Sequence, residues 1–88
     1  MVFLWYVTTR DEFLIKAVGA KIRTARKSKK LSMEKLAELA GIDYRQLSYV
    51  ELGETNPTIS TISAIAKGLS IPIKDLFDFE NENTFNKD

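Results

Sequence analysis

Residues 31–53, which read LSMEKLAELAGIDYRQLSYVELG, constrain the fold of this chain more than any other segment. The segment holds two short stretches of helical pattern, and each follows a side chain that favours a helix N-cap and precedes a glycine. The caps are Ser32 and Asp43, and the glycines are Gly41 and Gly53. The pattern predicts helices at residues 33–40 and 44–52, joined by a tight turn.

A longer helix is predicted before this pair. Thr9 and Glu12 match a capping box, which indicates a helix from about Arg10 to Lys29. Gly19 is its weak point, because glycine lowers helix propensity. Four apolar residues at helical spacing can form its inward stripe: Phe13, Ala17, Ile22 and Ala25.

Two more helices are predicted after the pair. Thr58 can cap a fourth helix that runs to about Leu69, and Pro72 suits the first turn of a short fifth helix through Phe77. We expect five apolar residues of the fourth helix to lie in the core: Ile59, Ile62, Ile65, Ala66 and Leu69. The predicted fold class is therefore all-α, a compact domain of five helices over residues 10–77.

The two ends of the chain differ from this domain. Residues 1–9 form an apolar arm, in which residues 2–7 are β-branched and aromatic and favour a short β-strand. We hypothesise that this strand pairs with the same segment of a second copy, the alternative being a disordered extension. Residues 78–88 are acidic and rich in asparagine, and we expect a flexible tail.

Composition argues against several classes of function. The chain has no histidine and no cysteine, which removes the commonest general base, metal ligand and thiol nucleophile. No glycine-rich phosphate loop, carboxylate pair or ordered set of calcium ligands is recognisable. We therefore expect no enzyme, no metal and no cofactor. No segment is long and apolar enough for a membrane helix, so we expect a cytoplasmic protein associated with the nucleoid.

Charge is distributed unevenly along the chain. Net charge is +1, yet residues 1–49 carry ten Lys and Arg against five Asp and Glu, whereas residues 50–88 carry three against seven. A basic first half is compatible with a surface that faces phosphates, and equally with a solvated helix face.

The second helix of the pair has the groups needed to read DNA. Leu47 and Val50 can rest on the core, with the small Ala37 allowing the two helices to cross closely. Four side chains then remain outward and able to reach base edges in a groove: Tyr44, Arg45, Ser48 and Tyr49.

At this point the chain resembles the lambda-repressor-like, or Xre-type, helix-turn-helix family. The resemblance covers residues 18–77 and rests on five segments in order: KIRTARKSKK, LSMEKLAELAGI, LSYVELG, NPTISTISAIAKGL and IPIKDLF. It implies that helix 3 of the five enters the major groove and that Arg26 pairs with Glu51. It also implies phosphate contacts from Ser32, Met33, Lys35, Thr55, Asn56 and Thr58.

Two residues depart from the family pattern. Met33 stands where glutamine is common, and Glu54 lies in a loop that is often basic. Both changes would weaken contacts with the DNA backbone.

The resemblance implies a sequence-specific regulator of transcription, a repressor that binds double-stranded DNA as a homodimer on a palindromic site. Small members of the family act as antitoxins with a toxin partner, as phage-type repressors or as restriction–modification controllers, and the sequence does not choose among these. Helix 5, with Ile71, Ile73, Leu76 and Phe77, is one candidate dimer surface. The alternative function is a protein-interaction module that kept the fold without specific DNA binding.

Overall fold

The computed structural model describes residues 10–79, and within them it is helical with no strand. The elements are α2 (Glu12–Ser28), α3 (Met33–Ala40), α4 (Tyr44–Leu52), α5 (Ile59–Leu69) and the 3₁₀ helix η1 (Ile73–Phe77). The predicted strand at residues 2–7 lies outside the described residues, as do residues 80–88 of the predicted tail.

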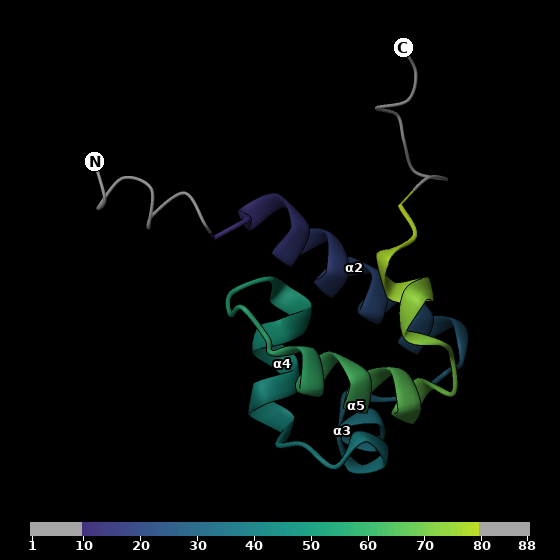
Figure 1. The fold of residues 1–88 in the computed structure, drawn as a ribbon. Helices are drawn as coiled ribbons and strands as arrows, with labels where there is room; N and C mark the ends of the chain where they lie inside the picture. Colours follow the sequence, from purple (N-terminus) through teal and green to yellow (C-terminus); the bar gives the residue numbers. More distant parts are fainter. Residues whose placement is uncertain (1–9, 80–88) are drawn as a thin grey trace, which may run out of the picture.

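The helices pack around one core (Figure 1). In that view α2 runs across the top, α3 and α4 lie below it, and α5 crosses in front. The main packing partners are α3 with α5 and α2 with α4, while η1 packs against α2 and α5. The core side chains that are fully enclosed come from every element: Ile22, Leu36, Leu47, Val50, Ile65, Leu69 and Leu76.

The predicted pair of helices and its turn are confirmed. The Ser32 side chain accepts a hydrogen bond from the backbone N–H of Lys35 at 3.0 Å, and Asp43 accepts one from that of Arg45 at 3.1 Å. Two glycines end these helices with φ angles of 73° and 74°, in the left-handed region that glycine adopts at low cost: Gly41 and Gly53.

The start of the first helix differs from the prediction. Asp11, rather than Thr9, is the N-cap of α2, and its carboxylate accepts a hydrogen bond from the N–H of Leu14 at 3.0 Å. An aspartate cap also places a negative charge at the positive end of the helix dipole, which threonine does not. Thr9 lies outside the described residues, and the helix ends at Ser28 rather than Lys29.

Two residues that we expected in the core are instead exposed. Phe13 is 67% exposed, because the buried face of α2 is formed by Ile15, Val18, Gly19, Ile22 and Arg26, on the other side of the helix. Ile59 is 74% exposed, because it is the first residue of α5 and extends beyond the elements that cover Ile62 and Ile65.

The fifth helix is also a correction. Ile73–Phe77 forms a 3₁₀ helix with Pro72 before it, and five residues are too few to repay the nucleation of an α-helix. Leu76 is buried in the core, so it is unavailable to a dimer surface. Phe79, which we placed in the tail, is partly buried against the core.

Gly19 explains how α2 and α4 come so close together. A Cβ atom built on Gly19 would lie 2.3 Å from the carbonyl oxygen of Val50 and 2.9 Å from that of Glu51. Only glycine fits this crossing, which fixes the orientation of α4 against the longest helix of the fold. Within residues 10–79, no helix has the length and apolar character needed to span a membrane.

Candidate nucleic-acid interface

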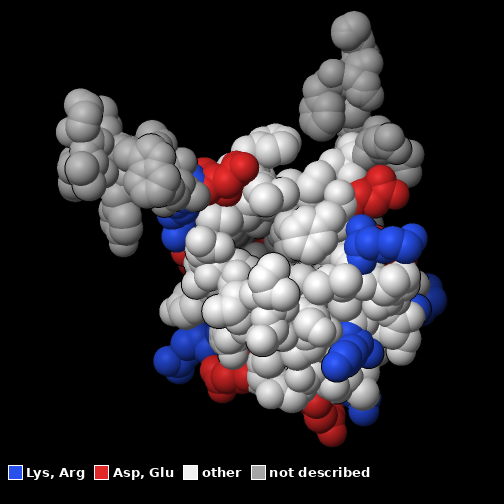
Figure 2. All heavy atoms as spheres, in the orientation of Figure 1, with Lys and Arg blue, Asp and Glu red and all other residues white. Residues whose placement is uncertain are grey.

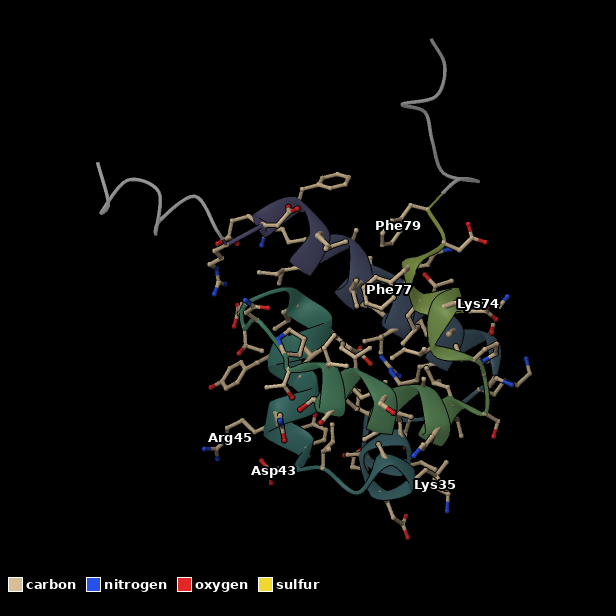
Figure 3. All side chains as sticks on the ribbon, viewed as in Figure 1. Lys35, Asp43, Arg45, Lys74, Phe77 and Phe79 are labelled. Atoms are coloured by element: carbon tan, nitrogen blue, oxygen red, sulfur yellow. The ribbon has the colours of Figure 1, made fainter. Side chains whose placement is uncertain are left out.

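α4 has one buried face and one exposed face, as we expected from its sequence. Leu47 and Val50 are enclosed by the core, whereas Tyr44 and Tyr49 are 49% and 45% exposed. Arg45 is exposed as well, and its side chain points away from the body of the domain (Figure 3). The structure thus presents two phenol rings and one guanidinium on the outer side of a short helix.

Ser48 takes a different place from the other three predicted base-reading residues. It is partly buried and lines a hollow of about 150 Å³ between α2 and α4, with Met33 of α3 also on its wall. Its hydroxyl is therefore at the edge of the exposed face rather than at its centre.

The predicted pair of Arg26 and Glu51 joins α2 to α4. Arg26 Nε donates to Glu51 Oε2 at 2.7 Å, and Nη2 donates to Oε1 at 3.0 Å, which makes the contact bidentate. Nη1 donates to the carbonyl oxygen of Leu31 at 3.0 Å. The two residues are 9% and 8% exposed, so this pair is a structural brace beneath the exposed face.

The pair also stabilises the charged form of Arg26. The hydrogen bond to Glu51 raises the pKa of the Arg26 guanidinium above its ordinary value, burial acts against it, and the negative charge of Glu51 raises it further. Arginine is charged at all ordinary pH values without this help. The brace therefore keeps its positive partner throughout the physiological range.

The predicted phosphate-contacting residues fall at the starts of two helices. Ser32 and Thr58 are exposed N-caps of α3 and α5, and each hydroxyl already accepts a backbone N–H, from Lys35 at 3.0 Å and from Thr61 at 3.1 Å. Helix N-termini with capping hydroxyls favour negatively charged ligands. Lys35 pairs with Glu38 at 3.6 Å, and its side chain remains 53% exposed, so it is accessible to a ligand.

The other three predicted phosphate contacts are less well placed. Met33 is partly buried and packs against the core, and its thioether donates no hydrogen bond. Thr55 is partly buried in the loop before α5. Asn56 is exposed and lines an apolar hollow with Leu14 of α2 and Phe77 of η1.

Two exposed residues were absent from our predicted site. Gln46 lies on α4 beside Arg45, and its amide Nε2 donates to Thr61 Oγ1 at 3.5 Å, which links α4 to α5. Its position in the first half of the helix was the available signal, because a glutamine amide can read adenine. Arg23 of α2 lines the same hollow as Ser48, which only the tertiary structure shows.

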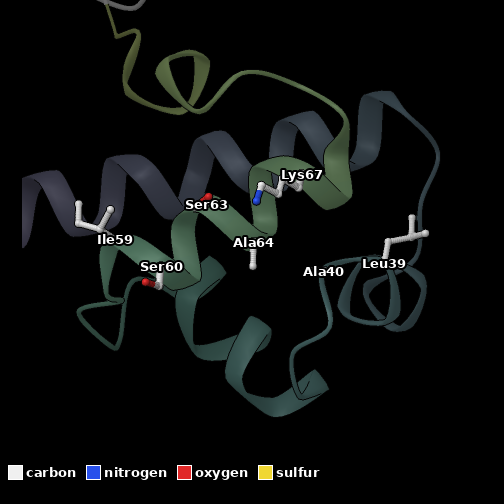
Figure 4. A pocket seen from close by; sticks show the side chains of 7 residues that line it. All are labelled: Leu39, Ala40, Ile59, Ser60, Ser63, Ala64 and Lys67. Atoms are coloured by element: carbon white, nitrogen blue, oxygen red, sulfur yellow. The ribbon is translucent and has the colours of Figure 1, made fainter.

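The remaining large hollow is a shallow one of about 520 Å³ between α3 and α5 (Figure 4). Its walls include Leu39, Ile59, Ser60, Ser63 and Lys67. Among residues 10–79 no group of acidic residues is arranged to hold a metal ion.

Comparison with known proteins identifies the class. The family model described as helix-turn-helix matches residues 22–76. The chain therefore belongs to the helix-turn-helix family, and the predicted lambda-repressor-like domain is confirmed.

Individual relatives agree with this assignment. The chain is 38% identical over 56 residues to the immunity repressor protein of Bacillus phage phi105, a match that covers 64% of this chain and 39% of that one. It is 32% identical over 69 residues to the HTH-type transcriptional regulator SinR of Bacillus subtilis strain 168, covering 77% of this chain and 62% of SinR. The chain thus spans less than two thirds of the length of these relatives.

A solved structure matches over nearly its whole length. The crystal structure of the restriction-modification controller protein C.AhdI from Aeromonas hydrophila superposes with a TM-score of 0.70 at 35% sequence identity. The match covers 72% of this chain and 96% of that one. The helical arrangement described above is therefore one that a protein of similar size also adopts.

Proposed function

We propose that the chain is a DNA-binding transcriptional regulator, a repressor that reads a specific double-stranded site as a homodimer. The observation that carries this proposal is the exposed face of α4. In a helix-turn-helix, the second helix lies in the major groove while the first crosses the backbone. Here α4 occupies that place and exposes Tyr44, Arg45 and Tyr49, while its opposite face is locked to the core.

In this proposal each side chain has a defined task. Arg45 donates two hydrogen bonds to a guanine, the commonest specific contact in the major groove. The phenols of Tyr44 and Tyr49 contact thymine methyl groups or phosphates, and Ser48 contacts the edge of the same groove. The capped starts of α3 and α5 hold the flanking phosphates through Ser32, Lys35 and Thr58.

Dimerisation supplies the second half of the interface. One domain of this size covers little DNA, and specific sites for such proteins consist of two half-sites about 10 base pairs apart.

One surface offers a place for a second copy to pack. An apolar hollow of about 150 Å³ lies between α2, α5 and η1, with exposed Leu14, Ile59 and Phe77 on its walls. The surface over α5 in Figure 2 is largely uncharged, with both basic and acidic side chains around its edge, as suits contact with a second copy.

We expect the substitution Arg45→Ala to weaken binding to the specific site by about 1–3 kcal/mol and to relax the base preference at one position in each half-site. The lost contact is a bidentate one to a single base pair, so affinity for unrelated DNA should fall much less. Fluorescence-anisotropy titration against the specific site and its single-base variants measures both effects.

The matched control is Arg10→Ala, which removes an exposed arginine paired with Glu12 near the start of α2. It should leave the base preference unchanged. If Arg45→Ala keeps the full base preference, then Arg45 does not read a base. A wild-type protein without salt-sensitive DNA binding would instead support the protein-interaction module.

A further inference from the structure

The hollow of about 150 Å³ between α2 and α4, which Ser48 and Met33 line, also has on its wall a positively charged side chain that is not part of the Arg26–Glu51 pair. Arg26 and Glu51 lie on its wall, but their charges balance, and each nitrogen of the Arg26 guanidinium already donates a hydrogen bond. Arg23 lines the same hollow, is exposed, and has no ion-pair partner within residues 10–79. The net positive charge of the hollow therefore comes from Arg23.

The hollow opens beside the proposed DNA-binding face. Its lining also includes Ser48 of α4 and Met33, the first residue of α3. Met33 has no hydrogen-bond donor on its side chain, so a phosphate that enters the hollow would find its unpaired charged donor at Arg23. A guanidinium is well suited to this role because it binds phosphate oxygens in a bidentate manner.

The charge pattern of α2 supports the same conclusion. Lys16, Arg23 and Lys27 are all exposed, and their spacing of seven and four residues places them on one face of the helix. Lys16 packs beside Gly53 at the end of α4, so this basic face runs along α4 rather than away from it. A DNA backbone next to α4 would meet these charges.

We propose that Arg23 binds a backbone phosphate of the DNA, so that α2 also contributes a phosphate contact. Our sequence analysis assigned such contacts only to α3, α5 and the loop before α5. This inference rests on the proposed function, because the ligand is the same duplex. Phosphate contacts position a protein on DNA without reading its sequence. Arg23 therefore contributes affinity and register, not base preference.

The test compares the wild-type chain with Arg23→Ala, Arg23→Lys and the control Lys74→Ala, which removes an exposed lysine from η1 (Figure 3). Binding to the specific site and to random duplex is titrated at several salt concentrations. For Arg23→Ala we expect an affinity about three- to tenfold lower for each bound subunit on both duplexes, and a log–log salt slope less steep by about 0.9 for each subunit, or about 1.8 for the dimer. Arg23→Lys should keep the wild-type slope, and Lys74→Ala should match wild type.

The outcomes separate the two proposals. Salt-dependent binding by the wild type with an unchanged slope in Arg23→Ala would overturn the role of Arg23 alone. An equal loss in Lys74→Ala would also overturn it, because the effect would then reflect net charge. Absence of salt-dependent binding in the wild type would overturn the proposed function together with this inference. Circular dichroism of each variant verifies that the exposed substitutions leave the fold intact.

Discussion

The substitution Glu51→Ala is expected to lower the free energy of unfolding by about 3–5 kcal/mol, a large part of the stability of a domain this small. Glu51 accepts two hydrogen bonds from Arg26, at 2.7 Å and 3.0 Å, and both side chains are buried. Removing the carboxylate leaves a buried guanidinium whose remaining contact is the carbonyl of Leu31. Urea unfolding followed by circular dichroism measures the change.

Glu38→Ala is the matched control for this prediction. Glu38 also pairs with a basic side chain, Lys35, but at 3.6 Å and on the surface, where ion pairs contribute from 0 to about 1 kcal/mol. The expected result is a loss for Glu51→Ala several times larger than for Glu38→Ala. Equal, small losses from the two variants would contradict the description of Arg26 and Glu51 as a buried brace.

Gly19→Ala is the second substitution with a large expected effect. The added methyl group would meet the carbonyl oxygen of Val50 at 2.3 Å, and backbone atoms cannot rotate away as a flexible side chain can. α2 and α4 must therefore separate, at a cost of about 3 kcal/mol, the upper part of the range for overpacked cores. This loss runs against helix propensity, because alanine in a free helix is favoured over glycine by about 1 kcal/mol.

Gly41→Ala separates crowding from backbone strain. A Cβ atom at Gly41 would have no neighbour within 4 Å, and its cost arises only from the φ angle of 73°. That cost is about 1–2 kcal/mol. Thermal and urea unfolding of both variants should show the greater loss for Gly19→Ala. A Gly19→Ala protein as stable as wild type would mean that α2 and α4 lie farther apart than described.

The features predicted from sequence with the greatest accuracy depend on neighbours along the chain. Ser32, Gly41, Asp43 and Gly53 act within one helical turn, so the ends of α3 and α4 could be read directly. Leu47 and Val50 were placed in the core correctly because a short helix between two caps has only one apolar face.

The features missed depend on contacts between distant segments. Nothing near Gly19 in the sequence indicates that Val50 lies against it, and Phe13 and Ile59 fit an apolar helical spacing although no element covers them. The competition between Thr9 and Asp11 for the helix cap was equally unreadable, since both residue types can cap. The exposure of Tyr44, Arg45 and Tyr49 on α4 could be predicted, because it depends on one helix. The sequence did not indicate that Arg23 of α2 lines a hollow with Ser48, or that Gln46 of α4 donates to Thr61 of α5.

The central claim, that α4 reads a specific duplex from within a symmetric dimer, is tested most directly by selection from random double-stranded DNA followed by sequencing, at two salt concentrations. We expect enrichment of one two-fold-symmetric sequence with half-sites about 10 base pairs apart, and an affinity that falls steeply as salt rises. Recovery of no preferred sequence, with binding that does not respond to salt, would contradict the account and would direct attention to a protein partner.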